Sequence, residues 1–336
     1  MKVKGFTLVE LLAIIVILAI IALITTPIVM DAIKSAKKGA VEEATNNYIK
    51  AVELTIQESR INGLKLSDGE YPITIDGNIC SDKDLECTDN KIMIQANGEK
   101  PNYGRIVLKN KSVVIERVIL KLDNYFVGYD IENNKFQAQE LYEGTLCTKA
   151  SGVDLNNLVA GNEFTCNFID NNRENNLTFY VLGTSGDNIS LIMNANVNEN
   201  GKAVTPPITR KFTVMWCGDE TLCKTNNNWD NTKGPLTAEE KLKEYTSSWK
   251  KLAFSQVTIP SVTQIRSAYT GSMPSWLKTN IGISNLIGYW TSIPDESSLS
   301  CARSVGYGGD IPCFNINESA YSGLRPVITI SKSNLS

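Results

Sequence analysis

A long apolar stretch near the start of the chain, interrupted by one acidic residue, constrains the fold more than any other feature. Residues 6–30 carry a single charge, Glu10. At about 1.5 Å per residue, a helix of this length would span about 37 Å, enough to cross a hydrocarbon core of about 30 Å. A carboxylate near the centre of a bilayer costs about 2.5 kcal/mol or more, so such residues are usually functional. The stretch predicts a membrane-spanning helix with a functional carboxylate near its start.

Two simpler interpretations fit this stretch poorly. A secretory signal peptide has a shorter apolar core followed by a small-x-small cleavage site. Here the run is longer, no Ala-x-Ala site follows it before Pro27, and Glu10 has no place in that pattern. A plain membrane anchor also leaves Glu10 unexplained. The series Lys4-Gly5-Phe6-Thr7-Leu8-Val9-Glu10, ahead of the apolar run, resembles the prepilin-type N-terminus of the type IV pilin and pseudopilin superfamily.

This resemblance implies a processing and assembly route. Prepilin peptidase would remove residues 1–5 by cutting after Gly5 on the cytoplasmic side, and the new N-terminus, Phe6, would be methylated. The single-pass subunit would stay in the cytoplasmic membrane until it joins other pilin subunits in a surface pilus. In the filament, Glu10 would pair with the amino group of a neighbouring Phe6. Breaking a buried ion pair is strongly unfavourable, so this pair would set the register between subunits.

The apolar stretch is expected to continue into an amphipathic helix. We expect one helix from Phe6 to about Ser59, kinked at Pro27 and stopped by Asn62-Gly63. Its second half should carry one apolar stripe of residues spaced about four apart. The predicted stripe consists of Ala32, Ala36, Ala40, Ala44, Tyr48 and Val52.

Composition argues against several functional classes. The chain of 336 residues has a net charge of −3 and no histidine. Without histidine there is no Ser-His-Asp or Cys-His catalytic arrangement and no His-ligated zinc site. The near-neutral charge gives no strong nucleic-acid signal. We therefore expect no enzyme activity, no cofactor and no metal site.

The eight cysteines lie beyond the apolar stretch and contain no Cys-x-x-Cys. An even number in an exported region indicates disulfides, although eight cysteines allow about 105 pairings. We expect nearest neighbours to pair, since each pair closes a loop of modest length; some free thiols are the alternative. The expected pairs are Cys80–Cys87, Cys147–Cys166, Cys217–Cys223 and Cys301–Cys313.

After Asn62, short β-like segments alternate with Asn, Gly and Asp turns, which is typical of an antiparallel sheet. Packed on the second half of the long helix, this sheet would form a pilin-like unit over residues 6–142. The fold class is therefore α+β. The expected strands lie at residues 71–75, 91–95, 105–109, 112–122, 125–131 and 135–139.

A second unit is expected over residues 143–336. It should contain a strand–turn–strand around Thr184–Asp187, a helix from Leu236 to Tyr245 capped by Thr237, and a shorter helix within 259–268. Its C-terminal strings resemble the C-type-lectin-like domain of Gram-positive surface proteins. Those strings are Tyr289-Trp290-Thr291-Ser292 and Gly323-Leu324-Arg325-Pro326-Val327-Ile328.

Candidate ligand-binding residues in this second unit have structural alternatives. Arg325 could bind an acidic ligand, but pairing with a buried acid inside the last strand is the favoured interpretation. The tryptophans, at positions 216, 229, 249, 276 and 290, are more typical of a core than of a sugar-stacking surface. Neither Trp229-Asp230-Asn231 nor Asp170–Glu174 forms a calcium signature, and the latter reads as a polar hairpin tip. We expect a glycan or protein ligand near 216–235 and 297–312, without metal.

Together these features predict a pilin-like structural subunit. The additional unit of about 190 residues favours a minor or tip pilin that displays an adhesive domain, because a major pilin is usually smaller. The alternative is a large major pilin, or a pseudopilin of a type II secretion or DNA-uptake machine.

Overall fold

The helix α1 runs without interruption from Leu8 to Ile61 in the computed structural model, a length of 54 residues. Pro27 lies inside this helix, and the hydroxyls of Thr25 and Thr26 each donate to a carbonyl four residues earlier. The helix stops at Gly63, whose φ of 89° suits glycine. The structure describes residues 8–63, 66–80, 91–109, 112–169, 176–204, 235–278, 288–294, 301–306, 308–315 and 322–336.

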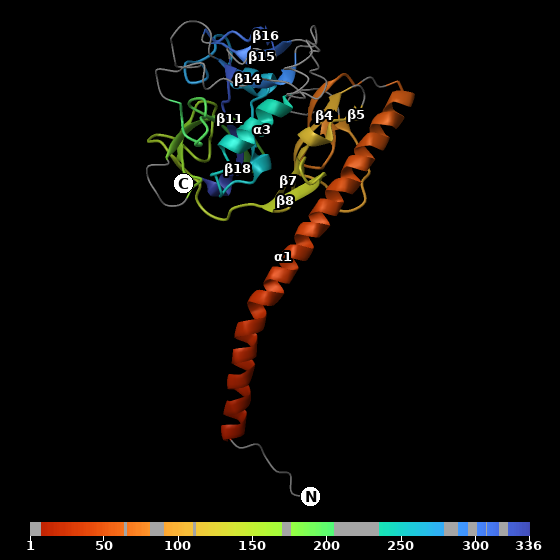
Figure 1. Ribbon diagram of the computed structural model, residues 1–336, viewed down its shortest axis with the longest axis vertical. Helices are drawn as coiled ribbons and strands as arrows, with labels where there is room; N and C mark the ends of the chain where they lie inside the picture. The colour runs from red at the N-terminus through yellow and green to blue at the C-terminus, as the bar shows by residue number, and fades with distance from the viewer. Residues whose placement is uncertain are drawn as a thin grey trace, which may run out of the picture.

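Only the second half of α1 packs against the rest of the molecule (Figure 1). Within this chain the predicted apolar stripe is buried in its second part only, since Ala32, Ala36 and Ala40 are exposed. The described sheet covers the helix only from Val41 onward, so the earlier alanines have no surface to pack against within one chain. The buried residues of α1 are Val41, Thr45, Tyr48, Ile49, Ala51, Val52 and Ile56.

A first antiparallel sheet follows the helix, with the strand order β1-β4-β6-β7-β8 and β5 paired to β4. Its apolar face and the buried side of α1 form one hydrophobic core. The strands are β1 (Gly69–Pro72), β4 (Tyr103–Lys109), β5 (Ser112–Val113), β6 (Ile119–Leu122), β7 (Tyr125–Asp130) and β8 (Lys135–Glu140). A two-stranded ribbon, β2 (Ile79–Cys80) with β3 (Lys91–Ile92), lies outside this sheet.

The single strand predicted over residues 112–122 is wrong. Strands β5 and β6 are separated by a 3-10 turn, η1 (Ile115–Arg117). The turn places the Arg117 side chain in the interior, where it is 3% exposed and bonds to residues distant in sequence. Because these partners lie elsewhere in the chain, local strand propensity does not reveal the interruption.

Two further sheets lie in the described part of residues 143–336. One has the order β13-β18-β12-β11-β10-β9 and is antiparallel. The other has the order β16-β15-β14-β17, with β14 and β17 parallel. The strands are β9 (Cys147–Lys149), β10 (Glu163–Cys166), β11 (Leu177–Ser185), β12 (Asn188–Met193), β13 (Val257–Thr258), β14 (Gly288–Pro294), β15 (Cys301–Val305), β16 (Cys313–Asn315), β17 (Ser322–Gly323) and β18 (Val327–Ser331).

The second sheet is buried on both faces. Because successive residues of a strand point to opposite sides, neighbours along one strand belong to different hydrophobic clusters. Leu191 and Ile328 belong to a large core that includes Trp249 and Trp290. Their neighbours Ile192 and Val327 belong to a separate cluster on the other face. A long N-terminal helix followed by antiparallel sheets confirms the predicted α+β class.

Among the described residues of the second unit there are also two helices and two 3-10 turns. Helix α3 (Leu236–Tyr245) has the predicted bounds, but Pro235 occupies its N-cap position. Thr237 therefore lies within the first turn, and its predicted capping role is wrong. Helix α4 (Val262–Ser267) is capped by Ser261, whose hydroxyl accepts from the Gln264 amide. The 3-10 turns are η4 (Phe254–Gln256) and η5 (Lys332–Asn334).

Two of the predicted disulfides are described, and both lie within the second unit. Cys147–Cys166 joins the paired strands β9 and β10, with Cα atoms 4.0 Å apart. Cys301–Cys313 joins β15 and β16, with Cα atoms 5.6 Å apart. Cys80 is also disulfide-bonded. The remaining predicted partners, Cys87, Cys217 and Cys223, lie outside the described residues.

The first sheet packs against the second unit with the face that points away from α1 (Figure 1). Phe126 of β7 contacts Leu141 and Ala253 in a small apolar cluster. Close approach depends on Gly128, because a side chain there would collide with η4: its Cβ would lie 2.9 Å from both Phe254 and Ser255. The ion pairs and cavities described below lie at this junction.

Candidate functional site

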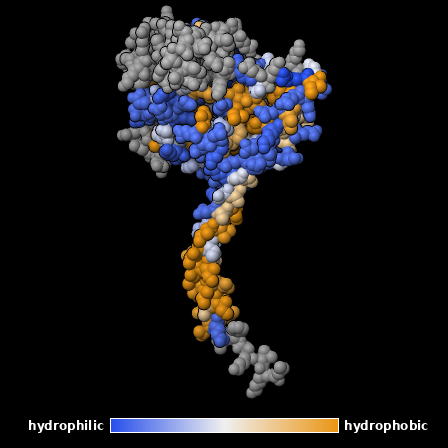
Figure 2. All heavy atoms as spheres, turned by 45° about the vertical axis from the view of Figure 1, so that its right-hand side comes forward, coloured by the Kyte–Doolittle hydropathy of each residue, from blue (hydrophilic) through white to orange (hydrophobic). Residues whose placement is uncertain are grey.

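The first candidate site is the exposed half of α1. Of the described helices, α1 alone is long and apolar enough to cross a membrane, and the apolar window is unburied. Figure 2 shows this half as a continuous hydrophobic surface projecting from a largely hydrophilic head. An apolar surface of this size on one subunit calls for a covering of lipid or of other helices.

Glu10 lies in the first turn of this exposed half. Its neighbours in the chain are exposed apolar side chains, with Leu8 83% and Val9 71% exposed. Gly5 and Phe6, the predicted cleavage and methylation residues, lie outside the described residues. The position of Glu10 is therefore one turn into an otherwise apolar helix, as its sequence spacing predicts.

Ion pairs mark the level at which α1 meets the head. Lys34 Nζ lies 3.2 Å from Glu140 at the end of β8, and Lys37 Nζ lies 2.5 Å from Asp123. Asp123 forms the β6–β7 turn with a φ of 46°, a conformation that aspartate tolerates better than most residues. The hydrogen bond to Asp123 raises the pKa of Lys37, and the bond to Glu140 raises that of Lys34. These pairs separate the head from the apolar half of the helix.

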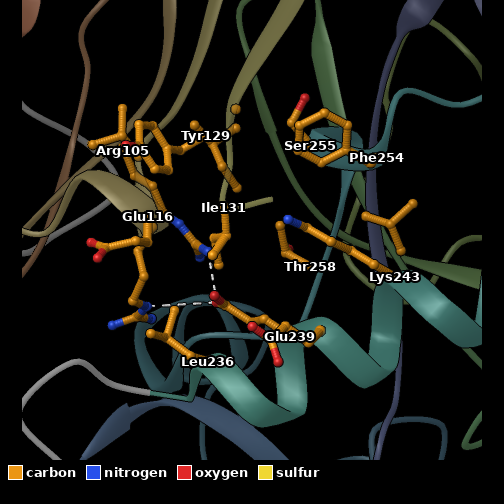
Figure 3. Close-up of a pocket in the computed structure, with 16 residues that line it drawn as sticks. Arg105, Glu116, Tyr129, Ile131, Leu236, Glu239, Lys243, Phe254, Ser255 and Thr258 are labelled. Atoms are coloured by element: carbon orange, nitrogen blue, oxygen red, sulfur yellow. Dashed lines mark hydrogen bonds and ion pairs between the residues drawn. The ribbon is translucent and has the colours of Figure 1, made fainter. Parts of the chain in front are cut away.

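The second candidate site is a buried charge network at the junction. It has two arginines from the first sheet region, Arg105 on β4 and Arg117 in η1, and two acids, Glu70 on β1 and Glu239 on α3. Arg117 Nη2 lies 2.6 Å and Arg105 Nη1 3.5 Å from Glu70. Glu239, which projects from α3 toward Arg105 (Figure 3), lies 3.4 Å from Arg105 Nη2 and 3.6 Å from Arg117 Nε. Arg117 also donates to the Ser292 carbonyl at 2.8 Å.

This network connects the two units electrostatically. Burial alone raises the pKa of the Glu70 carboxyl, but Arg105 and Arg117 lower it by more, so the pKa of Glu70 falls below its ordinary value. Glu239 and Ser292 both belong to the second unit, whereas Glu70 belongs to the first. Both arginines therefore bridge the units, because they belong to the first unit and pair with Glu239 of the second.

A groove with a mixed polar and apolar lining lies at the network and includes Glu70 and Arg105 in its walls. Its volume is about 670 Å³, and β1, β4, β11, β12, α4 and β18 contribute to its walls. A smaller cavity of about 40 Å³, shown in Figure 3, shares Arg105, Ile119, Ser255 and Thr258 with it. The groove is rich in hydroxyls, including Tyr103, Thr184, Ser190, Thr258, Ser261, Thr263 and Ser267. Hydroxyls both donate and accept hydrogen bonds, so the lining suits an uncharged polar ligand.

Several other residues predicted as candidate ligand contacts are buried in the protein interior. Arg325 is fully buried and bonds to backbone carbonyls in the described part of the chain, not to a buried acid as predicted. Trp249 and Trp290 are core residues, while Trp276 is half-buried against Tyr180. Trp216, Trp229, the 170–174 tip and residues 216–234 of the first predicted ligand loop lie outside the described residues. Most of the second loop, 297–312, is described, and it contains strand β15. The described residues contain no group of three or more acids or cysteines that could hold a metal ion.

Sequence reasoning missed the junction network entirely. One signal was available: Arg105 and Arg117 each sit within apolar, strand-like segments, where a charge is costly unless paired. That signal predicts buried partners without identifying them. Glu70 and Glu239 gave no signal, since an acid in a short strand or a surface helix is ordinary.

Comparison with known proteins bears on the N-terminus. Residues 1–26 match the family model of the prokaryotic N-terminal methylation motif. No curated protein and no solved structure matches the chain. With the exposed apolar half of α1, the motif indicates a type IV pilin-like or pseudopilin-like subunit, processed by prepilin peptidase, assembled with other pilins and held in the membrane before assembly. The lectin-like resemblance of residues 143–336 stays a prediction.

Proposed function

We propose that this chain is a minor subunit of a type IV pilus that displays its second unit at the cell surface, in an adhesive rather than an enzymatic role. The observation that carries the proposal is the exposed apolar half of α1 behind a methylation motif. It supplies an assembly surface that the head does not cover. The large head supports a minor position, since it carries two further sheets beyond the one that packs on α1.

In this proposal, cleavage after Gly5 releases the leader and leaves Phe6 as a methylated N-terminus. Glu10 then pairs with the Phe6 amine of an adjacent subunit inside the filament. The pair fixes the axial register, because a displaced subunit would leave both charges buried alone. The ion pairs of Lys34 and Lys37 join α1 to the first sheet where the helix enters the head.

The displayed ligand-binding surface belongs to the second unit and its junction with the first sheet. The hydroxyl-lined groove of about 670 Å³ supports an uncharged polar ligand such as a glycan. A protein ligand on the loops of the second unit is the other form of adhesion. Neither requires a metal ion.

Processing and assembly are tested with variants in cells that express the pilus machinery. Gly5→Val should block maturation, because a branched residue before the cut does not fit a tight membrane protease site, and Val3→Leu is its control. Glu10→Leu should enter the membrane, but its amount in sheared filaments should fall about 100-fold or more relative to wild type, since isolating one partner of a buried pair costs about 3 kcal/mol or more. Val9→Leu should assemble normally.

The outcomes separate the alternatives. Surface protein that still begins at Met1 would overturn the pilin assignment. Incorporation of Glu10→Leu at the wild-type level would contradict a position within the filament shaft. A position at the filament tip would remain possible, because a tip subunit has no further subunit beyond it to pair with Glu10. Sparse antibody labelling of filaments supports a minor pilin, and dense labelling supports a major pilin. Loss of secretion or DNA uptake, without loss of adhesion, on deletion of the gene would favour a pseudopilin.

A further inference from the structure

A primary amine and a carboxamide meet in the buried junction between the first and second sheets. Lys121 lies on β6 and Asn188 begins β12, 67 residues later in the chain. The side chains are almost fully buried: Lys121 is 8% exposed and Asn188 6% exposed. Lys121 Nζ donates a hydrogen bond to Asn188 Oδ1 at 2.7 Å. The nitrogen of one unit thus lies against the carbonyl group of the other.

The surroundings of Lys121 disfavour a charged amine. Its partners on the two adjacent strands are Tyr103 and Phe126, whose rings pack edge to face. Burial lowers the pKa of Lys121, and the charge of Asp187 raises it by less, so the pKa falls below the ordinary lysine value. A lower pKa increases the neutral fraction, which is the nucleophilic form of the side chain.

The hydrogen bonds of Lys121 also suit a neutral nitrogen better than an ammonium. An ammonium group has three donors and no acceptor. Among the described residues, Asn188 Oδ1 is the hydrogen-bond acceptor found for Nζ, and no carboxylate lies within ion-pair distance. A buried charge with most of its donors unmet is costly. A covalent amide would remove both the charge and the unmet donors.

We propose that Lys121 and Asn188 join in an intramolecular amide bond that fastens the first sheet to the second. Neutral Nζ attacks Cγ of Asn188, a C–N bond forms, and the carbonyl electron pair moves onto Oδ1. The proton that Nζ loses is transferred to Nδ2, which makes the amide nitrogen a leaving group. The carbonyl re-forms, the Cγ–Nδ2 bond breaks, and ammonia leaves. No oxidant, reductant or further reactant is consumed.

The fold supplies what this slow reaction lacks in solution. Reactants held in contact in one orientation gain effective molarities of about 10⁵ M or more. The bond would span the junction, unlike Cys147–Cys166 and Cys301–Cys313, which both lie within the second unit. A filament subunit under tension would then keep its head docked after the ion pairs of the junction had failed.

The test is the mass and peptide map of the full-length mature protein after denaturation and thiol reduction. The wild-type protein should be lighter than its sequence mass by one ammonia per chain, apart from N-terminal methylation. Proteolysis should release a branched peptide joining the segments that contain Lys121 and Asn188. Lys121→Arg should restore the full mass, because a guanidinium still donates to Oδ1 but does not attack the amide. Lys135→Arg, at an exposed position of β8, should keep the loss.

Folded wild-type protein of full mass, with linear peptides only, would overturn the proposal. Loss of ammonia without a branched peptide would also overturn it, since a backbone succinimide at Asn188 gives the same mass. The wild-type map decides by itself, so a variant that misfolds does not weaken the test.

Discussion

At the scale of single residues, Arg325 illustrates how a buried cation is satisfied without an acid. Its Nε donates to the Met193 carbonyl at 2.6 Å, and its guanidinium lies 5.0 Å from the Tyr289 ring centre. The other guanidinium nitrogens donate to the carbonyls of Trp276, Leu277 and Lys278. Burial lowers the pKa of Arg325 and raises the pKa of Tyr289 to about 12. Arg325 therefore ties the end of β12 to the 276–278 turn.

Arg325→Lys should destabilise the head although it keeps the charge. A lysine lacks the planar fork, so at least two buried carbonyls lose their donor, at about 1–3 kcal/mol each. We expect the free energy of unfolding to fall by about 3 kcal/mol, measured by urea denaturation in detergent. The control, Arg266→Lys, lies at an exposed position of α4 and should change stability by less than about 0.5 kcal/mol. A loss no greater than that of the control would show that the fork geometry is unimportant.

At the scale of elements, local sequence patterns predicted the helices and hairpins whose bounds depend on nearby residues. The bounds of α3 and the β11–β12 hairpin followed from periodicity and turn residues. The η1 interruption and the burial of α1 did not, because each depends on partners distant in the chain. Arg117 turns inward toward Glu70 and the Ser292 carbonyl, and Ala32 stays exposed because no described element reaches it. The N-terminal assembly segment was predictable, whereas the junction network required the fold.

The charge network makes the junction sensitive to acid through Glu70. The pKa of Glu70 is lower in the folded protein than its ordinary value of 4.5, so Glu70 stabilises the fold above that value. This contribution is lost as the pH falls through the lowered pKa. Stability of the wild type should therefore drop more steeply below about pH 4.5 than that of Glu70→Gln.

Thermal unfolding at a series of pH values measures this difference. At neutral pH, Glu70→Gln should cost about 3 kcal/mol, because Arg105 and Arg117 lose the carboxylate that neutralises them. Glu132→Gln, in the exposed turn between β7 and β8, provides the matched control and should follow the wild-type curve. Parallel curves for wild type and Glu70→Gln would mean that this carboxylate has the same pKa in the folded and unfolded protein.

At the scale of the whole molecule, two hydrophobic cores on either side of a polar junction explain the organisation. One core combines α1 with the first sheet. The large core of the second unit draws its buried residues from 146–330 only, and the cluster around α4 draws its own from 182–327. Sequence reasoning placed a unit boundary at 142/143, and whether each side folds alone stays a prediction. The contacts across this boundary include a small apolar cluster, the ion pairs, the Lys121–Asn188 contact and further hydrogen bonds such as Phe254 N to Gln139 Oε1.

Residues 143–336 should therefore fold without the first 142 residues. The fragment keeps its cores and both of its described disulfides, but Glu239 loses Arg105 and Arg117. We expect a soluble fragment with a cooperative thermal transition at a lower temperature than that of the whole chain.

Glu239→Gln should lower the stability of the whole chain by about 1–3 kcal/mol and leave the stability of the fragment unchanged, because the partners of Glu239 exist only in the whole chain. An unfolded fragment would indicate one continuous folding unit, and an equal effect of Glu239→Gln in both would place its stabilising contacts within the second unit.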